Sequence, residues 1–317
     1  MALVSIALLA VSLFSVGVLS DRIIRYALVL SKFLGFSEMA AGFMLLSVTT
    51  SLSELSVSVV AAIIGEGGLS VGNVLGSNVA NLTIILGLAV FLSKTEIWMK
   101  GQPQKELVQF LFLSSIIPLF IFQRGSLGPI LGIVLLVLFV YFSVTISRKA
   151  EKTEPIEQKA NGNVAVVGLK FLVCVGLIIM LSKFVVDSSV EIAGFIDLPA
   201  SIIGATAVGL GTSLPELATT LQALKKKLFG MALGNVIGSC VTNLTLILGL
   251  SALLSFPEVG VDVLAVQSIM FYVLLSSLSV WYMVGVGERV SRRAAFFLCG
   301  LYIVFILQQV GVSVFIF

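Results

Sequence analysis

The chain of 317 residues is 58% hydrophobic and only 11% charged, with a formal net charge of +3 and a mean hydropathy of +1.16. This composition excludes a soluble globular domain and is typical of an integral membrane protein; the small net charge gives no indication of a nucleic-acid partner. The chain has no histidine, and its three cysteines (Cys174, Cys240 and Cys299) lie inside apolar segments. The sequence therefore predicts neither a disulfide framework nor a thiolate metal site.

Apolar runs long enough to cross a bilayer follow one another along almost the whole chain and predict ten transmembrane helices. They cover residues 2–20, 38–64, 69–93, 104–123, 127–147, 164–186, 198–224, 228–254, 261–284 and 294–315. The runs 38–64 and 198–224 are polar in the middle, which indicates tilted or broken helices. Arg22 and Arg25 come after the first run rather than before it, so this run predicts a membrane helix with its N-terminus outside, not a signal peptide.

The positive charges are distributed unevenly over the two sides that these spans define. With the N-terminus outside, 17 of the 19 Lys and Arg residues fall on the cytoplasmic side, and only Arg124 and Lys183 fall on the other. An excess of Lys and Arg in cytoplasmic loops is the usual orientation signal of membrane proteins, and it supports both the span count and the orientation. We therefore expect a multi-pass protein of the cell membrane with both termini outside.

Two pairs of matching sequence blocks occur in the two halves of the chain. Thr50-Ser51-Leu52-Ser53-Glu54 matches Thr212-Ser213-Leu214-Pro215-Glu216, and the block 72–81 (GNVLGSNVAN) matches 234–243 (GNVIGSCVTN). The offset is 162 residues throughout, so Glu54 corresponds to Glu216 and Asn81 to Asn243. The small-residue pairs Gly72/Gly76 and Gly234/Gly238 predict close packing of helices.

The connection between the two blocks differs in charge between the halves. Gly65-Glu66-Gly67-Gly68 has no basic residue, whereas Lys225-Lys226-Lys227 stands at the corresponding place in the second half. One connection therefore faces outside and the other inside, which requires an odd number of spans per half. The sequence predicts an all-α polytopic protein of two inverted five-helix repeats, an architecture of alternating-access transporters. Their expected bounds are 1–147 and 164–317, joined by a short cytoplasmic linker at 148–163.

Only Glu54 and Glu216, of the 16 acidic residues, lie deep inside predicted spans. Acidic residues at membrane depth are costly and indicate a functional site. The surrounding Ser, Thr and Asn side chains offer oxygen, which suits hard cations such as calcium, sodium, magnesium or manganese. Pro215 predicts a helix break beside Glu216, and Ser53 at the equivalent place predicts a milder one. Two carboxylates without a basic partner must be neutralised by one divalent ion, two monovalent ions or two protons, and this competition is a physical basis for antiport.

The paired blocks resemble the two alpha-repeats of the calcium/cation antiporter superfamily, most closely its sodium/calcium exchanger branch, with the motifs at 42–93 and 204–255. The resemblance implies ten helices, with helices 1 and 6 sliding past a group of four ion sites between helices 2, 3, 7 and 8. It implies calcium binding by Glu54 and Glu216 with the carbonyl groups of Thr50 and Thr212. The implied remaining ligands are Ser51, Ser77, Ser213 and Ser239 with the carbonyl groups of Ser47 and Gly209 for sodium, and Asn81 and Asn243 for the central site.

The chain departs from the motifs of this family at a few positions. Ser53 replaces the proline and Thr49 the glycine of the first motif, and Asn243 stands where some relatives have an acid, which argues against potassium dependence. The leading hypothesis is a sodium-driven calcium antiporter that exports calcium; the alternative is a proton-driven antiporter of calcium or another divalent cation. A passive channel would need a continuous filter, and the residues of known intramembrane proteases are missing. We expect no enzyme activity, no cofactor, no obligate protein partner, and Ca2+ and Na+ as the transported ions.

Overall fold

The apolar runs of the chain form helices because backbone N–H and C=O groups away from water must bond to one another. The computed structural model describes residues 2–33, 48, 50–94, 96–98, 102–116, 125–149, 164–225, 227–255 and 259–311. In the first half these form α1 (Ala2–Phe33), α3 (Leu52–Ile63), α4 (Gly67–Ala80), η1 (Asn81–Ile85), α5 (Leu86–Ser93), β1 (Ile97–Trp98), α6 (Gln102–Ser115), β2 (Ser126–Leu127) and α8 (Pro129–Lys149). In the second half they form α9 (Val164–Ile196), α10 (Ala200–Ile203), η2 (Gly204–Val208), α11 (Gly209–Thr212), α12 (Leu214–Lys225), α13 (Phe229–Thr242), η3 (Asn243–Ile247), α14 (Leu248–Leu254), β3 (Val259–Gly260), α15 (Val263–Gly285), β4 (Arg289–Val290) and α16 (Arg292–Gln309).

The helices follow the predicted spans, but two of them are longer than predicted. α1 continues to Phe33 and α9 to Ile196, beyond the apolar ends predicted at 20 and 186. The extension of α1 contains the good helix formers Arg, Leu, Ala and Lys, whereas the extension of α9 contains only Glu and Ala of this class, so local propensity accounts for the first extension and not for the second. Residues 38–47 of the second predicted span and 150–163 of the predicted linker lie outside the described residues.

By length and composition, four helices of the described ranges can cross a membrane. They are the continuous segments Gly67–Ser93, Val164–Ile196, Phe229–Leu254 and Val263–Gly285. Shorter apolar helices occur at Leu3–Leu19, Leu52–Ile63, Pro129–Thr145 and Ala200–Thr212. The breaks that shorten the helices at 52–63 and 200–212 fall in the two runs that the sequence marked as polar in the middle.

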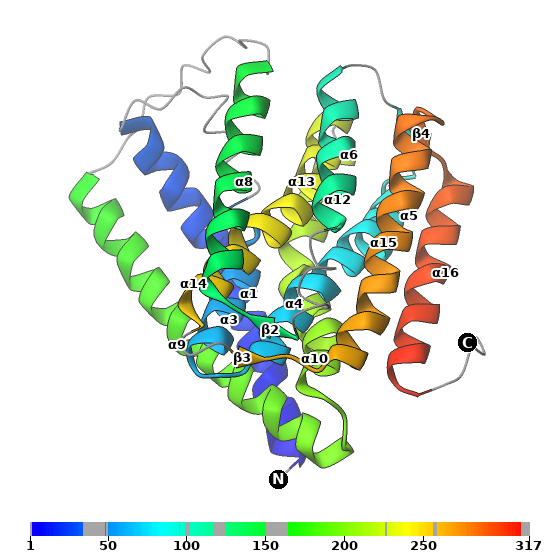
Figure 1. The fold of residues 1–317 in the computed structure, drawn as a ribbon. Coiled ribbons are helices and arrows are strands. Elements are labelled where there is room, and N and C mark those ends of the chain that lie inside the picture. Colours follow the sequence, from blue (N-terminus) through cyan, green and yellow to red (C-terminus); the bar gives the residue numbers. More distant parts are fainter. Residues whose placement is uncertain are drawn as a thin grey trace.

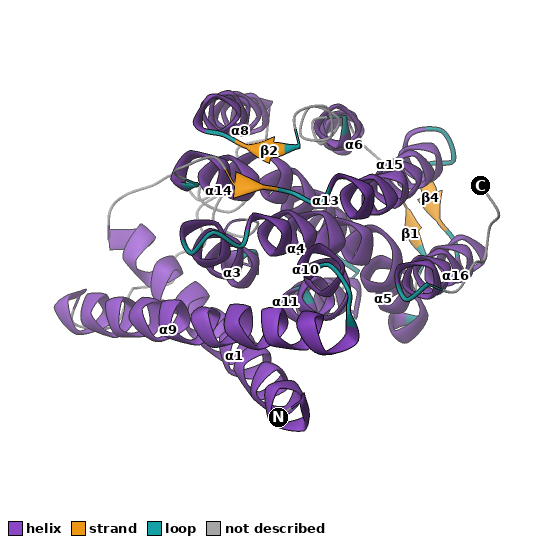
Figure 2. Ribbon diagram, turned by 60° about the horizontal axis from the view of Figure 1, so that its bottom comes forward, coloured by secondary structure: helices purple, strands orange, loops and turns teal. Residues whose placement is uncertain are grey.

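Four short strands correct the expectation of a purely α-helical chain. β1 pairs antiparallel with β4, with Ile97 opposite Val290, and β2 pairs antiparallel with β3, with Ser126 opposite Gly260. Each strand has only two residues, which is too short to show the alternation of polar and apolar residues that predicts a strand. The two small sheets lie at the margin of the helical bundle, one beside α15 and α16 and the other beside α8 and α14 (Figure 2).

The helices form a layered arrangement around α4 and α13. Figures 1 and 2 show α1 and α9 lying against one another on one side. In Figure 2, α6, α8 and α15 lie on the opposite side, and α16 lies at the edge of the bundle beside α5. The broken helices α3 and α10–α12 and the two helical segments α4–α5 and α13–α14 lie between these layers (Figure 2). The matching sequence blocks are therefore all in the central layer.

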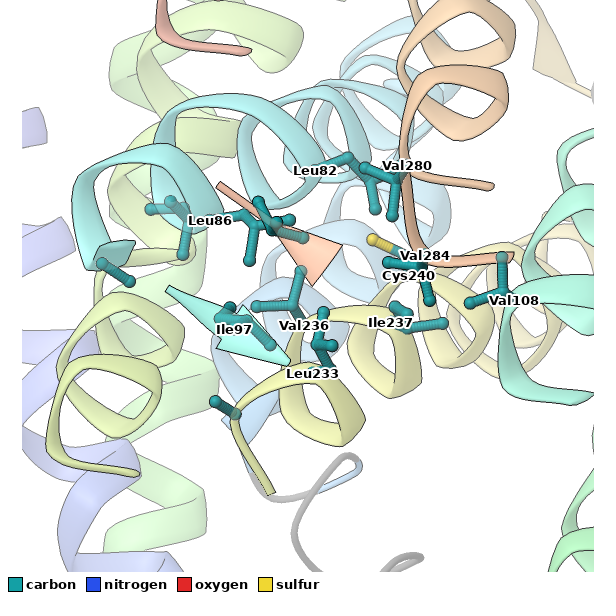
Figure 3. Close-up of a cluster of buried hydrophobic side chains, with 14 of the residues drawn as sticks. Leu82, Leu86, Ile97, Val108, Leu233, Val236, Ile237, Cys240, Val280 and Val284 are labelled. Atoms are coloured by element: carbon teal, nitrogen blue, oxygen red, sulfur yellow. The ribbon is translucent and has the colours of Figure 1, made fainter. Parts of the chain in front are cut away.

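Apolar side chains from both halves share one core around α13. Figure 3 shows this cluster, in which side chains of η1, α5 and β1 meet those of α13, α15 and α6. Its labelled members, all buried, are Leu82, Leu86, Ile97, Val108, Leu233, Val236, Ile237, Cys240, Val280 and Val284. The two halves thus fold as one body, and the central layer is held by apolar packing on its α6/α15 side.

Two glycines of α4 allow a very close approach of the second half. A Cβ atom at Gly72 would lie 2.1 Å from the carbonyl oxygen of Ser201, and one at Gly76 would lie 2.1 Å from that of Ala205. This confirms the close packing predicted from the small-residue pair in the first block. At Gly234, the equivalent of Gly72, an added Cβ meets nothing within 4 Å among the described residues. The segment 39–43, which corresponds to 201–205, lies outside the described residues, so the close packing predicted at Gly234 and Gly238 stays a prediction.

Candidate cation site

Each matching motif lies where a helix is interrupted. α11 ends at Thr212 and α12 begins at Leu214, with Ser213 between them at φ −86° and ψ 4°. In the first half Ser51 has nearly the same conformation, φ −84° and ψ 17°, immediately before α3. The milder break predicted there is therefore not observed. The residue that differs, Ser53 or Pro215, is the second of the new helix, where no intrahelical bond uses the N–H and either residue fits.

These breaks place both glutamates in the first turn of a helix. Glu54 lies in the first turn of α3 and Glu216 in the first turn of α12, and both side chains have 0% exposure. The partial positive charge of a helix N-terminus favours an anion at this place. Neither carboxylate has an ion pair with any of the described Lys or Arg residues. Two buried carboxylates without a cationic side chain require a bound cation or proton for charge balance.

The two motifs are connected by reciprocal hydrogen bonds. Ser213 of the second half donates to Oε1 of Glu54 at 3.0 Å, and Ser51 of the first half donates to Oε1 of Glu216 at 3.3 Å. Ser239 also donates to Oε1 of Glu216 at 3.3 Å. The structure therefore brings together the two glutamates and the serines that the sequence predicted, although their motifs lie about half the chain apart.

The two motif threonines make equivalent contacts with the opposite half. Thr212 donates to Oδ1 of Asn73 at 3.2 Å, and its hydroxyl lies 3.4 Å from that of Ser77. Thr50 donates to Oδ1 of Asn235 at 3.3 Å, and its hydroxyl lies 3.2 Å from that of Ser239. Each threonine of one motif thus contacts the second block of the other half.

Asn73 and Asn235 are functional-site residues that the sequence analysis did not single out. The side-chain amide of Asn73 donates to the backbone carbonyl of Glu54 at 3.3 Å, and that of Asn235 donates to the carbonyl of Glu216 at 3.2 Å. Each amide also donates to a hydroxyl group one helical turn after the glutamate: Asn73 to Ser58 at 2.8 Å and Asn235 to Thr220 at 2.9 Å. The signal was present, because the same Gly-Asn pair begins both blocks. The two asparagines position the glutamate-bearing turns.

The carbonyl group of Gly209 accepts hydrogen bonds from hydroxyl groups of both halves. It accepts hydrogen bonds from Ser213 at 2.8 Å and from Ser77 at 3.1 Å. This places Gly209 beside two of the four serines that the resemblance assigned to sodium. Ser47, the equivalent of Gly209 in the first half, lies outside the described residues, as does Thr49.

Asn81 and Asn243 begin two π-helical turns, η1 and η3, which interrupt the helices of the central layer. Such turns are frequent at functional sites. Asn243 donates to Oδ1 of Asn78 at 3.0 Å. Within the described residues, four buried atoms of the predicted site residues have no hydrogen-bond partner: both side-chain amide atoms of Asn81, Oδ1 of Asn243 and Oε2 of Glu216. Buried polar atoms without partners in the protein are costly, and a bound ion or water can satisfy them.

The donor set is composed of oxygen and contains two formal negative charges. The described residues contain no group of three or more His, Cys, Asp and Glu side chains that could hold a metal ion. Hydroxyl, carbonyl and amide oxygens together with two carboxylates fit hard cations, which take many oxygen ligands, and do not fit soft metals. One divalent cation or two monovalent cations balance the two negative charges of this arrangement.

Comparisons with known proteins give the family and the fold of the chain. The sequence model of a family described as "Sodium/calcium exchanger protein" matches the chain twice, at residues 4–148 and 167–311. Inner membrane protein YrbG of Escherichia coli (strain K12) is 32% identical over 81% of this chain and 82% of its own length. Sodium/calcium exchanger MaX1 of Methanosarcina acetivorans is 29% identical over 91% of this chain and 93% of its own length. A structure of the sodium-calcium exchanger NCX_Mj, soaked with Na+ and Sr2+, covers 96% of this chain and 98% of its own with a TM-score of 0.64 at 24% identity, and thus shows the same fold.

The family match, together with the helical fold, indicates a membrane protein of the cation-antiporter class. More particularly, because the family model matches most of the chain in two copies, the chain belongs to the sodium/calcium exchanger protein family.

Proposed function

We propose that this protein is a secondary active antiporter that exchanges Na+ for Ca2+ by alternating access, in the direction of calcium export. The observation that carries the proposal is the pair Glu54 and Glu216, both fully buried and joined across the two halves by Ser213 and Ser51. One Ca2+ balances the two carboxylates, and two Na+ balance them equally well. If the empty, doubly charged site cannot change its orientation in the membrane, transport requires exchange of one load for the other.

The proposal includes ten transmembrane helices in two inverted repeats, 1–147 and 164–317, with the linker 148–163 between them. Reciprocal contacts support a two-fold relation of the halves, because in such a relation residue i meets j and j meets i. Ser51–Glu216 and Ser213–Glu54 form one reciprocal pair, and the strand pairs β1–β4 and β3–β2 form another. An odd number of spans per half then makes the repeats inverted.

Two pairs of equivalent residues touch each other and support the position of this two-fold axis. Asn78 donates to the carbonyl of Cys240, and the hydroxyl groups of Ser115 and Ser277 lie 2.7 Å apart. In both pairs the partners are separated by 162 residues, the offset of the repeat. A residue can contact its own symmetry equivalent only at the axis. The proposed axis therefore passes between α4 and α13 and between α6 and α15.

The proposed orientation places the N- and C-termini outside the cell. α16 begins beside β4, which contains Arg289, and ends at the end of the molecule where α1 begins (Figure 1). α8, which ends at Lys149, finishes at the same end as β4 (Figure 1). The basic segments are thus at one end, and the start of α1 and the end of α16 are at the other, which agrees with the positive-inside rule if the basic end is cytoplasmic.

We assign cation ligands to the glutamates and to the motif residues around them. Glu54 and Glu216 bind Ca2+ with the carbonyl groups of Thr50 and Thr212, in accord with their burial and with the oxygen-rich surroundings described above. The other proposed ligands, for sodium or for the central position, are Ser51, Ser213, Ser77, Ser239, Asn81, Asn243, Ser47 and Gly209.

Uptake of calcium-45 into proteoliposomes tests the function. The purified protein is reconstituted, and uptake is compared for an outward sodium gradient, a pH gradient and no gradient. We expect uptake with the sodium gradient alone, and loss of uptake in Glu54→Gln and in Glu216→Gln. Glu191→Gln, which removes an exposed carboxylate on α9, is the matched control and should transport like the wild type.

Two results would contradict the proposal in different ways. Uptake with the pH gradient alone would show that protons drive the exchange. Full transport in Glu54→Gln or Glu216→Gln, with wild-type thermal stability, would remove the basis of the site itself.

A further inference from the structure

The two halves of the site differ at one position that lies next to a glutamate. Ser53 precedes Glu54, whereas Pro215 precedes Glu216, and both residues are buried. Each is the second residue of the helix that follows the break, where the backbone N–H is not needed for the helix. The backbones at the two breaks are nearly the same, so the consequence of the difference is the presence or absence of a hydroxyl group.

The hydroxyl group of Ser53 lies against two oxygen atoms of the site. It is 2.8 Å from the carbonyl oxygen of Thr212 and 3.0 Å from Oε2 of Glu54. Glu54 therefore has a hydroxyl partner on each oxygen, Ser213 on Oε1 and Ser53 on Oε2. At Glu216, where proline supplies no hydroxyl, Oε2 is buried and has no hydrogen-bond partner among the described residues.

The single proton of Ser53 cannot serve both neighbours. A hydroxyl group has one proton and two lone pairs, and when Glu54 is ionised both the carbonyl oxygen of Thr212 and Oε2 of Glu54 are acceptors. When Ser53 donates to one of these oxygen atoms, its own oxygen still lies within 3.0 Å of the other with no proton between them, and this contact is repulsive. A cation that coordinates the hydroxyl, the carbonyl and the carboxylate oxygen at once removes this conflict, as in transporter sites where freed backbone carbonyl groups bind Na+.

The charge of this group of oxygens fits a monovalent cation. The Oε1 atoms of Glu54 and Glu216 each face a serine of the opposite half, so they form the part of the site that is shared between the halves. Oε2 of Glu54 instead faces Ser53 of its own half. One carboxylate oxygen with two neutral oxygens balances a single positive charge, whereas a divalent ion needs both carboxylates.

We propose that Ser53 is a ligand of Na+ at a position beside Glu54, together with the carbonyl of Thr212 and Oε2 of Glu54. The equivalent position beside Glu216 lacks this ligand, because Pro215 stands there. The two halves of the site thus contribute unequally to sodium binding. This inference rests on the proposed function, since it assigns one of the two coupling ions to named atoms.

Ion-dependent thermal unfolding of the purified full-length protein tests the inference without transport. The unfolding midpoint is followed at fixed pH while NaCl replaces choline chloride, and in separate titrations with CaCl2. We expect Ser53→Ala and Ser53→Pro to raise the sodium concentration for half-maximal stabilisation about tenfold, as for loss of one polar ligand. The calcium concentration for half-maximal stabilisation shifts less than the sodium concentration, because Ser53 touches calcium ligands but is not itself one of the proposed calcium ligands. Ser53→Thr, which keeps the hydroxyl, behaves like the wild type.

The reciprocal variant Pro215→Ser provides a gain-of-ligand test. It places a hydroxyl beside Oε2 of Glu216, and we expect a lower sodium concentration for half-maximal stabilisation. Ser53→Pro copies the backbone of the second half, so it keeps the test decisive if Ser53→Ala does not fold.

Three results would overturn the inference. They are a wild-type sodium response in Ser53→Ala and Ser53→Pro, an equal shift of the sodium and calcium responses, and the absence of sodium-dependent stabilisation in the wild type. A wild-type protein that binds sodium through Ser53 yet takes up calcium only with a pH gradient would contradict the proposed function and leave the sodium ligand in place.

Discussion

Asn78 and Cys240 occupy equivalent positions of the two repeats and contact each other directly. The side-chain amide of Asn78 donates to the backbone carbonyl of Cys240 at 3.1 Å, and the Cys240 thiol lies 4.0 Å from the carbonyl of Asn78. Oδ1 of Asn78 in turn accepts the hydrogen bond from Asn243. Asn78 therefore connects α4 with both α13 and η3, at the place where the repeats meet.

Asn78→Ala should destabilise the protein measurably. The substitution removes two hydrogen bonds and leaves the buried amide of Asn243 without its partner, and an unsatisfied buried group costs about 1–3 kcal/mol. We expect a lower unfolding midpoint of the purified protein in detergent. The effect should appear equally in sodium, calcium and choline buffers, because Asn78 is not a proposed ligand. A shift confined to calcium buffers would instead assign Asn78 to the ion site.

The sequence predicted the helices and both glutamates because each signal occurs twice. A buried carboxylate such as Glu54 is unusual by itself, and a second one at Glu216 in a matching block strongly favours a functional role. The helices were predictable because apolar length alone is decisive in a membrane. Their ends were not, since α1 continues through a polar segment to Phe33.

Other features depend on tertiary partners and could not be predicted from local sequence. Gly72 is packed against the backbone of Ser201 in the opposite half, and nothing in the sequence around Gly72 names this partner. The role of Asn73 depends on where the carbonyl of Glu54 points after the helix break. The strands β1 to β4 pair across more than a hundred residues and contain two residues each, which leaves no periodic pattern to recognise.

The contact between Ser115 and Ser277 should persist through the transport cycle. In an inverted-repeat transporter the two halves exchange their conformations between the outward and inward states. A contact between equivalent residues is converted into itself by this exchange, so it is the same in both states. The hydroxyl groups of Ser115 on α6 and Ser277 on α15 are 2.7 Å apart, and a disulfide of about 2.05 Å fits between cysteines at these positions with a small adjustment.

We therefore expect the double variant Ser115→Cys/Ser277→Cys to cross-link on oxidation and still to transport calcium. Cleavage at a protease site introduced into the linker 148–163 separates the two halves on a denaturing gel unless the disulfide joins them. Each single variant is the control and should give two fragments. Transport that stops on oxidation and returns on reduction would show that α6 and α15 move relative to each other, against the proposed axis.

Alanine at Gly72 and at Gly234 should have opposite effects on stability. At Gly72 the new Cβ would lie 2.1 Å from the backbone oxygen of Ser201, an overlap that only a backbone shift relieves. Such overpacking typically costs about 1–3 kcal/mol. At Gly234 the Cβ meets nothing within 4 Å among the described residues, and Ala is favoured over Gly inside a helix by about 0.8–1.0 kcal/mol.

The thermal unfolding of the two variants checks this prediction, with each serving as the control of the other. We expect a lower midpoint for Gly72→Ala and an unchanged or higher midpoint for Gly234→Ala. Equal destabilisation would mean that α13 is packed at Gly234 as closely as α4 is packed at Gly72.

The contact of α1 with the helix break in the second half should influence the rate of exchange. A Cβ at Gly211, in α11, would lie 2.8 Å from Cδ1 of Leu13, and Gly17 of α1 lies near the ring of Pro215. α1 therefore rests on the segment that carries Thr212 and Ser213. If α1 slides past the site during transport, as proposed for this family, a protruding methyl group on that segment hinders the movement.

Gly211→Ala should therefore slow calcium exchange with little effect on calcium affinity. The obstructing atom is the end of a flexible side chain, so we expect a rate reduced about threefold, which corresponds to less than 1 kcal/mol in the barrier. The second substitution Leu13→Ala removes that atom and should restore the rate, because the two changes act on one contact and their effects are then non-additive. Gly176→Ala on α9, where a Cβ meets nothing within 4 Å among the described residues, controls for the effect of a methyl group alone. A double variant as slow as Gly211→Ala would show that the Leu13 contact does not limit the movement of α1.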